Sequence, residues 1–214
     1  MTQDRGTYLR DPATIYRESF AAIRREAPID RLPGDLRLVA LRLIHACGMP
    51  DILGDLAWTA DAVAAGRAAL RAGAPILVDA TMVAAGIRRA GLPADNRIVC
   101  TLGDDATAAR AAAHATTRAA AAVEAWRERL GGAVVAIGNA PTALFRLLEL
   151  LAEGAPRPAL VLGFPVGFIG AAEAKEALIG HRPEVPHIIL RGRRGGSAMA
   201  AAALNALLAD DASP

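Results

Sequence analysis

One histidine lies in a stretch whose other residues are mostly apolar, and it is the first candidate for chemistry. The stretch is LRLVALRLIHACG, residues 36–48, in which His45 comes four residues after Leu41 and three after Arg42. Helical spacing would place the imidazole at the inner edge of a helix that ends at Gly48. An imidazole can donate or accept a proton near neutral pH, so His45 is a candidate acid or base. The alternative is a core histidine that one backbone carbonyl satisfies.

A second set of candidates follows the ends of three apolar runs. These exits read AIGNAPTALF, VLGFPVGFIG and LRGRRGGSAM, and each run stops at a glycine. Glycine lets a ligand approach the backbone, and the amides that begin a helix attract carboxylates and phosphates. Tight packing alone is the alternative reason for such turns. The ligand contacts predicted at the three exits are Gly138, Asn139, Thr142, Pro165, Val166, Gly167, Gly195, Gly196 and Ser197.

A fourth exit, VDATM at residues 78–82, adds polar side chains to the same expected edge. The predicted contacts there are Asp79, Thr81 and Met82. Asp79 has an alternative role as a cap of its own helix. Guanidinium groups bind carboxylates through two parallel hydrogen bonds, so arginines near these turns would suit an acidic ligand. The arginines concerned are Arg118, Arg193 and Arg194.

The first predicted helix carries one hydroxyl on its apolar face. Asp11-Pro12 is typical of a helix start, and Pro28 marks its end. Ser19 lies on the apolar face and is either a donor to a ligand or a hydroxyl bonded to the helix carbonyl four residues earlier. The face consists of Tyr16, Ser19, Phe20, Ile23 and Ala27, with Arg24 at its margin.

These candidates are positioned by short apolar runs that alternate with helical stretches. The predicted strands are 75–78, 97–101, 133–137, 159–162 and 187–190, with a loop or short strand within 51–58. The predicted later helices are 62–72, 82–90, 106–130, 141–151, 171–179 and 198–208. Such alternation predicts an α/β fold, a three-layer sandwich with a mainly parallel, doubly wound sheet whose exits meet at one edge. We expect a single domain, 1–214, with a flexible arm at 1–10 and a helical pair at 11–48 that carries His45.

Composition and motifs exclude several function classes. The 214 residues carry a net charge of +2 without a basic block, which argues against nucleic acid as a partner. Two distant cysteines and four unpaired histidines do not indicate a protein-held metal. The polar start MTQDRGTYLRDP and the absence of a long apolar span predict a cytoplasmic protein that does not enter membranes. No GxGxxG, GxxxxGK[ST] or GxSxG motif occurs, which disfavours a nucleotide-dependent enzyme and predicts single-group proton transfer on a polyanionic ligand.

Longer stretches resemble the precorrin-8X methylmutases, the isomerases of the corrin pathway. The matching stretches are RDPATIYRESFAAIRREA at Arg10, RLIHACG at Arg42, GAPILVDATMVAAGI at Gly73, VVAIGNAPTALF at Val134, GFPVGFIGAAEAKEAL at Gly163 and RGRRGGSAMAAAALNAL at Arg191. The resemblance implies a homodimeric α/β enzyme of cobalamin biosynthesis that needs no external cofactor. Its substrate would be the tetrapyrrole precorrin-8X, whose methyl group moves from C11 to C12 to give hydrogenobyrinic acid.

The resemblance also implies roles for particular residues. His45 matches the family's catalytic histidine, which would protonate the macrocycle, or hold a proton there, during a 1,5-sigmatropic shift. Ser19 would contact the substrate, with Arg24 beside it, and Arg118 would bind substrate carboxylates. HACG after the apolar run is closer to the metal-free, oxygen-dependent branch than to the cobalt-carrying branch. The alternatives are a cobalt-precorrin-8 methylmutase and a non-catalytic carrier of hydrogenobyrinic acid.

Overall fold

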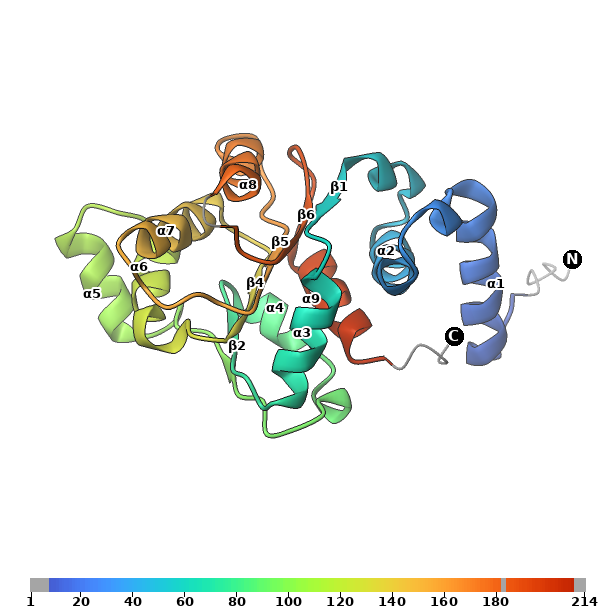
Figure 1. Ribbon diagram of the computed structural model, residues 1–214, viewed down its shortest axis with the longest axis horizontal. Coiled ribbons are helices and arrows are strands. Elements are labelled where there is room, and N and C mark those ends of the chain that lie inside the picture. The colour runs from blue at the N-terminus through green and yellow to red at the C-terminus, as the bar shows by residue number, and fades with distance from the viewer. Residues whose placement is uncertain (1–7, 182–183, 210–214) are drawn as a thin grey trace, which may run out of the picture.

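A six-stranded sheet forms the centre of the computed structural model, which describes residues 8–181 and 184–209 (Figure 1). The strand order is β1-β6-β5-β4-β2-β3. The strands are β1 (Leu56–Trp58), β2 (Ile76–Val78), β3 (Ile98–Val99), β4 (Val134–Ile137), β5 (Leu160–Gly163) and β6 (His187–Leu190). All residues of β2, β4, β5 and β6 are buried, as expected for strands that are covered on both faces.

The sheet is mainly parallel, as predicted. Strands β2 to β6 pair in parallel, and only β1 pairs antiparallel, with β6. In that pair Leu56 lies opposite Leu190, so the start of β1 is at the carboxyl end of β6. The segment that precedes β1 therefore reaches the edge at which the parallel strands end.

Helices cover both faces of the sheet, which confirms the three-layer α/β sandwich. Their bounds are α1 (Pro12–Glu26), α2 (Gly34–Cys47), α3 (Ala62–Arg71), α4 (Thr81–Gly86), α5 (Asp105–Ala113), α6 (Arg118–Glu124), α7 (Pro141–Ala152), α8 (Ala171–Gly180) and α9 (Ser197–Leu207). Short 3-10 helices occur at η1 (Ile29–Arg31), η2 (Pro50–Asp55), η3 (Arg89–Gly91) and η4 (Arg127–Arg129). Apolar residues of α2, α3, α4 and α9 form one core, and those of α6, α7 and α8 form the other.

The alternation of side chains along β4 explains the two cores. Val134 and Ala136 belong to the core with α2 and α9, whereas Val135 and Ile137 belong to the core with α7 and α8. Successive residues of a strand point to opposite faces, so one short apolar run supplies both layers. Among the described residues, no helix is long and apolar enough to cross a lipid bilayer.

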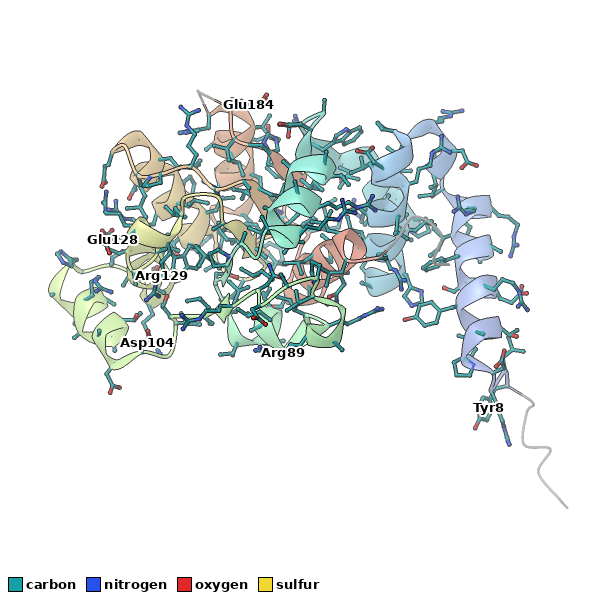
Figure 2. All side chains as sticks on the ribbon, turned by 60° about the horizontal axis from the view of Figure 1, so that its bottom comes forward. Tyr8, Arg89, Asp104, Glu128, Arg129 and Glu184 are labelled. Atoms are coloured by element: carbon teal, nitrogen blue, oxygen red, sulfur yellow. The ribbon has the colours of Figure 1, made fainter. Side chains whose placement is uncertain are left out.

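Helix α1 lies outside the sandwich, against α2 (Figure 1). Asp11 caps α1, since its Oδ2 accepts a hydrogen bond of 2.8 Å from the amide of Thr14, and the helix ends before Pro28 as predicted. Tyr8 lies at the outer end of α1, at the opposite end of the molecule from Asp104 and Glu128 (Figure 2). Most of the arm predicted at 1–10 lies outside the described residues.

The single helix predicted at 106–130 is wrong. Helix α5 ends at Ala113, the chain turns through Ala115 at a φ of 47°, and α6 begins at Arg118. The hydroxyl of Thr117 accepts a hydrogen bond from the amide of Ala120 and so caps the second helix. An alanine-rich composition therefore concealed a break that one capping threonine produces.

The helix predicted at 82–90 is shorter than expected. Helix α4 ends at Gly86, where the side chain of Asn205 on α9 donates to the carbonyl of Gly86 and accepts from the amide of Arg88. These two bonds replace the next helical turn. A side chain distant in sequence thus sets the end of α4.

Candidate active site

His45 lies in the last turn of α2 and is exposed, so its predicted inward position is wrong. The inner face of α2 is made by other residues, among them Val39, Leu43 and Ile44, which are buried against the core. His45 instead faces α1. Gly48 ends the helix as predicted, in a left-handed conformation with φ of 69°.

Three side chains contact the imidazole of His45, and a fourth packs on two of them. The hydroxyl of Ser19 lies 2.8 Å from Nδ1, so the core alternative, with one backbone carbonyl as partner, is not what the structure has. The ring of Tyr16 stacks on the imidazole with a centroid distance of 5.2 Å, and Phe20 meets it edge-on at 5.6 Å. The guanidinium of Arg42 lies over both aromatic rings, at 5.4 and 5.2 Å. These contacts fix the plane of the imidazole and occupy Nδ1, which leaves Nε2 for chemistry.

The three glycine-rich exits converge at one edge of the sheet, as predicted. The amide of Val166 donates to the carbonyl of Asn139 over 3.3 Å, which joins the turns after β4 and β5. The amide of Gly167 donates to the carbonyl of Arg193 over 3.1 Å, and that of Gly196 to Phe164 over 2.8 Å, which joins the turns after β5 and β6. The three turns thus form one continuous surface, which we call the rim (residues 138–142, 164–170 and 191–197).

Two rim glycines are required by close packing. A Cβ atom at Gly138 would lie 2.8 Å from both Cα of Ser197 and Cβ of Ala200, and one at Gly195 would collide with the carbonyl oxygens of Phe164 and Pro165. Gly138 and Pro165 are buried, so neither is accessible to a ligand on the surface of this chain. The packing role considered for these glycines applies to both Gly138 and Gly195.

Asp79 has a role that neither sequence interpretation foresaw. It is 1% exposed, and its two carboxylate oxygens accept hydrogen bonds of 2.8 to 2.9 Å from three successive amides. The donors are Gly138, Asn139 and Ala140, in the turn after β4. Desolvation by burial raises the pKa of Asp79, and the three amide donors oppose that rise. Asp79 therefore shapes the rim from below and does not cap its own helix.

Because of these bonds, fewer rim amides are available to bind a ligand than the sequence predicted. The amides of the turn after β4 point to Asp79, and those of Val166 and Gly167 bond within the rim. In helix α9 the amide of Gly196 bonds to Phe164, but no side chain caps the first turn that begins at Ser197. Among the predicted amide donors, the first turn of α9 is the part that can receive an anion.

Further predicted contacts lie on or beside the rim. Asn139, Val166, Thr81 and Met82 are exposed, the last two at the start of α4. Thr142 is half-buried, and its hydroxyl lies 2.8 Å from that of Thr117, the residue before Arg118. This contact places Arg118 beside the turn after β4, where Nη2 of Arg118 donates to the carbonyl of Leu102 over 3.0 Å.

The remaining predicted arginines lie in three different surroundings. Arg193 is exposed on the rim, with its guanidinium 5.4 Å from the ring centroid of Phe168. Arg194 turns away and bonds to Asp51 over 2.5 Å and Asp55 over 2.6 Å on η2. Arg24 pairs with Asp30 at 3.5 Å, and no contact joins it to His45 within the described chain.

The topology brings His45 to the end of the sheet that carries the rim. Helix α2 is followed by η2, which leads into β1 at Leu56, beside the carboxyl end of β6. The bonds of Arg194 to η2 join this connection to the turn after β6. In addition α9, which starts on the rim at Ser197, packs along α2. His45 and the rim therefore share one end of the molecule.

Sequence reasoning missed two features of this end. Phe168 and Ile169 are 85% and 91% exposed on the rim. Lys175 on α8 is fully buried under the turn after β6. A signal for Lys175 was present, since it is the one lysine in a chain with twenty-three arginines.

Comparison with known proteins identifies the family of this chain. The family model described as precorrin-8X methylmutase matches residues 14–210. A precorrin-8X methylmutase of Pseudomonas aeruginosa is 60% identical over 200 residues, covering 94% of this chain and 96% of that one. The chain belongs to the precorrin-8X methylmutase family. Members of this family are isomerases of cobalamin biosynthesis, so the chain is an enzyme of that class.

Other family members agree in sequence and structure. A precorrin-8X methylmutase of Sinorhizobium is 56% identical, with 94% of this chain and 95% of that one covered. The crystal structure of a precorrin-8X methyl mutase from Thermus thermophilus superposes with a TM-score of 0.83 at 43% identity, over 92% of this chain and 94% of that one. A cobalt-precorrin-8 methylmutase of Methanothermobacter thermautotrophicus is 39% identical, over 83% of this chain and 81% of that one. The identity is thus higher to these proteins named precorrin-8X methylmutase than to that cobalt-precorrin-8 methylmutase.

Proposed function

We propose that this enzyme moves a methyl group from C11 to C12 of precorrin-8X and releases hydrogenobyrinic acid, with His45 as the proton donor and acceptor. The observation that carries this proposal is the hydrogen bond of 2.8 Å between Ser19 and Nδ1 of His45, at the end of the sheet that carries the rim. A rearrangement within one molecule needs orientation and one well-placed acid, and the site offers both. No external cofactor takes part in the proposed reaction.

The hydroxyl of Ser19 determines which nitrogen of His45 reacts. A serine hydroxyl can donate to an unprotonated Nδ1 or accept from a protonated one. In both cases Nδ1 remains occupied, and Nε2 is the nitrogen that exchanges a proton with the macrocycle. Substrate and product are isomers, so a proton that Nε2 delivers before the methyl shift returns to it afterwards. The bond from C11 to the methyl group breaks as the bond to C12 forms.

Recognition of the acidic macrocycle is assigned to charged and apolar groups together. Arg118 and Arg193 would pair with its carboxylates, and the uncapped first turn of α9 would receive another. The exposed side chains of Met82 and Val166 offer apolar contacts to its flat faces. Ser19, Thr81, Asn139, Gly167 and Ser197 remain proposed contacts at the margin of this surface.

We propose that the enzyme works as a homodimer in the cytoplasm. Large apolar side chains that are exposed in a single chain commonly mark contact surfaces. Phe168 and Ile169 are two such side chains. The two cysteines, Cys47 and Cys100, are free thiols, which suits a reducing compartment.

A single-turnover absorbance assay tests the proposed reaction. Purified enzyme in excess over precorrin-8X should give the spectrum of hydrogenobyrinic acid, and His45→Ala should bind the tetrapyrrole but lose about 10²- to 10⁴-fold in rate. A carrier without activity would bind the product and leave the substrate spectrum unchanged.

The matched control is His114→Ala. His114 is an exposed histidine at the end of α5, and it belongs to neither the rim nor the His45 cluster. We expect this variant to keep the native rate. Native turnover by His45→Ala would refute the role given to His45, even if the isomerisation itself were observed.

A further inference from the structure

The one lysine of the chain occupies a buried position. Lys175 on α8 has a relative exposure of 0%, whereas the other twenty-three basic residues are arginines. A lysine is almost never fully buried unless its charge is paired or hydrogen-bonded. The position therefore demands a compact ammonium group, and its partners show what that group does.

The ammonium of Lys175 bonds to the backbone of the rim. Its Nζ donates to the carbonyl oxygen of Gly192 over 2.9 Å and to that of Arg194 over 2.6 Å. Both carbonyls belong to the turn between β6 and α9, and Gly192 adopts a left-handed φ of 74° there. The turn thus curls around one positive charge. A planar guanidinium has a larger, forked head and cannot replace an ammonium at such a point.

A second attachment holds the same turn from the other side. The side chain of Arg194 bonds to Asp51 and Asp55 on η2, the segment that directly follows the helix of His45. Helix α8 belongs to one core and α2 to the other, on opposite faces of the sheet (Figure 1). Lys175 and Arg194 therefore fasten the turn across the end of the sheet, between the two layers.

We propose that Lys175 is a positioning residue: its ammonium holds the backbone of the turn after β6 and, through Arg194, sets the place of the rim relative to His45. The side chain touches no substrate, and it acts through the turn that leads into the first turn of α9. The inference rests on the proposed function in so far as the turn binds the substrate.

The pH dependence of this attachment follows from burial. Desolvation lowers the pKa of Lys175 to about 8, and the nearby carboxylate of Asp55 opposes that change. A neutral amine donates weaker hydrogen bonds than an ammonium, so the turn loosens as pH rises through this value. Arg146 of α7 is paired with Glu124 and so faces away, towards α6. The other charged or titratable side chains on the surrounding elements are Asp51 and Asp55 on η2, Glu149 on α7, His187 on β6, Arg191, Arg193 and Arg194 in the turn, and Glu173 and Glu176 on α8.

As pH rises, the attachment of the turn weakens, but the contribution of Lys175 to the stability of the fold should increase. Because the folded-state pKa of Lys175 lies below its ordinary value of 10.5, the unfolded chain binds more protons between about pH 8 and 10.5. The contribution of Lys175 to the free energy of unfolding therefore increases with pH in this window. A loss of substrate affinity above pH 8 without a loss of stability would identify the attachment.

Nuclear magnetic resonance and kinetics of the full-length enzyme test the proposal. With one lysine, ¹⁵N-lysine labelling gives a single side-chain signal, and we expect an ammonium protected from solvent exchange at pH 7. For Lys175→Gln we expect KM for precorrin-8X to rise about tenfold, with kcat within about threefold of native. KM of the native enzyme should rise above pH 8, and that of Lys175→Gln should stay level.

Two controls separate positioning from stability and charge. Leu150→Ala removes a buried side chain of α7 from the core that α7 shares with α8, and Glu173→Gln changes a charge in the first turn of α8. Both should keep the native KM and its pH dependence. The proposal is overturned if the lysine signal lacks protection, if Lys175→Gln keeps the native KM profile, or if Leu150→Ala reproduces the change. Failure of the native enzyme to isomerise precorrin-8X would instead overturn the proposed function. The affinities of the native enzyme and of Lys175→Gln for hydrogenobyrinic acid would then test the role of Lys175.

Discussion

The hydroxyl of Ser19 lies 2.8 Å from Nδ1 of His45 and joins helix α1 to the last turn of α2. We predict that Ser19→Ala lowers kcat about five- to tenfold and changes KM little, because the imidazole loses the partner that fixes its orientation. Single-turnover rates at saturating enzyme measure the effect.

Ser19→Thr is the matched control for this prediction. It keeps a hydroxyl at the same place on α1 and should restore most of the rate. Native kcat in Ser19→Ala would show that the stacked ring of Tyr16 suffices to hold His45.

A second prediction concerns the buried carboxylate of Asp79. Asp79→Asn replaces one acceptor oxygen by a donor that faces the amides of the turn after β4. The free energy of unfolding should fall by about 2–3 kcal/mol, since a buried donor loses its partner. Urea unfolding measures it, with Asp61→Asn as the control at an exposed carboxylate that makes no capping bond. Equal midpoints for the two variants would contradict the role given to Asp79.

Local patterns in the sequence predicted the sheet and the rim. Short apolar runs that end in glycine identified β4, β5 and β6, and their parallel pairing followed from the helices between them. The break before α6 escaped prediction because alanine continues on both sides of Thr117, and one capping hydroxyl decides it.

Non-local relations account for what the sequence did not reveal. Asp79 reaches the turn after β4 because β2 and β4 are neighbours in the sheet, although about sixty residues separate them in the chain. His45 faces away from the core of the sandwich and towards α1, which packs on α2 and supplies its partners Tyr16 and Ser19. Spacing within one helix cannot show what a second helix will cover.

A third prediction uses the close approach at Gly138. A Cβ there would lie 2.8 Å from Cα of Ser197, which is backbone and cannot give way as a flexible side chain would. Gly138→Ala should move the start of α9 from β4, destabilise the fold by about 1–3 kcal/mol and raise KM. Gly103→Ala is the control, because nothing lies within 4 Å of its added Cβ. Thermal unfolding that is unchanged in Gly138→Ala would contradict this packing.

A fourth prediction addresses the exposed turn before α8. If Phe168 and Ile169 are covered by a second copy of the chain, Phe168→Ser with Ile169→Ser should shift the enzyme from dimer to monomer in sedimentation equilibrium. Leu9→Ser is the control at another exposed apolar residue, on the stretch before α1. A native dimer that persists in the double variant would exclude this turn from the interface.

The last prediction concerns acid stability and the ion pairs between α6 and α7. Desolvation acts to raise the pKa of Glu124, but hydrogen bonds from Arg146 and Arg127 outweigh it and lower the pKa. A carboxyl group whose folded-state pKa is lowered stabilises the fold above its unfolded value of 4.5, and this contribution is lost as pH falls through the folded-state pKa. Arg146→Gln should therefore reduce the free energy of unfolding at pH 7 more than at pH 3, because protonation of Glu124 removes its contribution as pH falls. Urea unfolding at pH 7 and at pH 3 measures the difference. Arg157→Gln, at an exposed arginine outside these pairs, is the control and should reduce the free energy of unfolding little, and equally, at both pH values. An Arg146→Gln loss that is the same at pH 3 as at pH 7 would show that packing of the long side chain, and not its charge, holds α6 to α7.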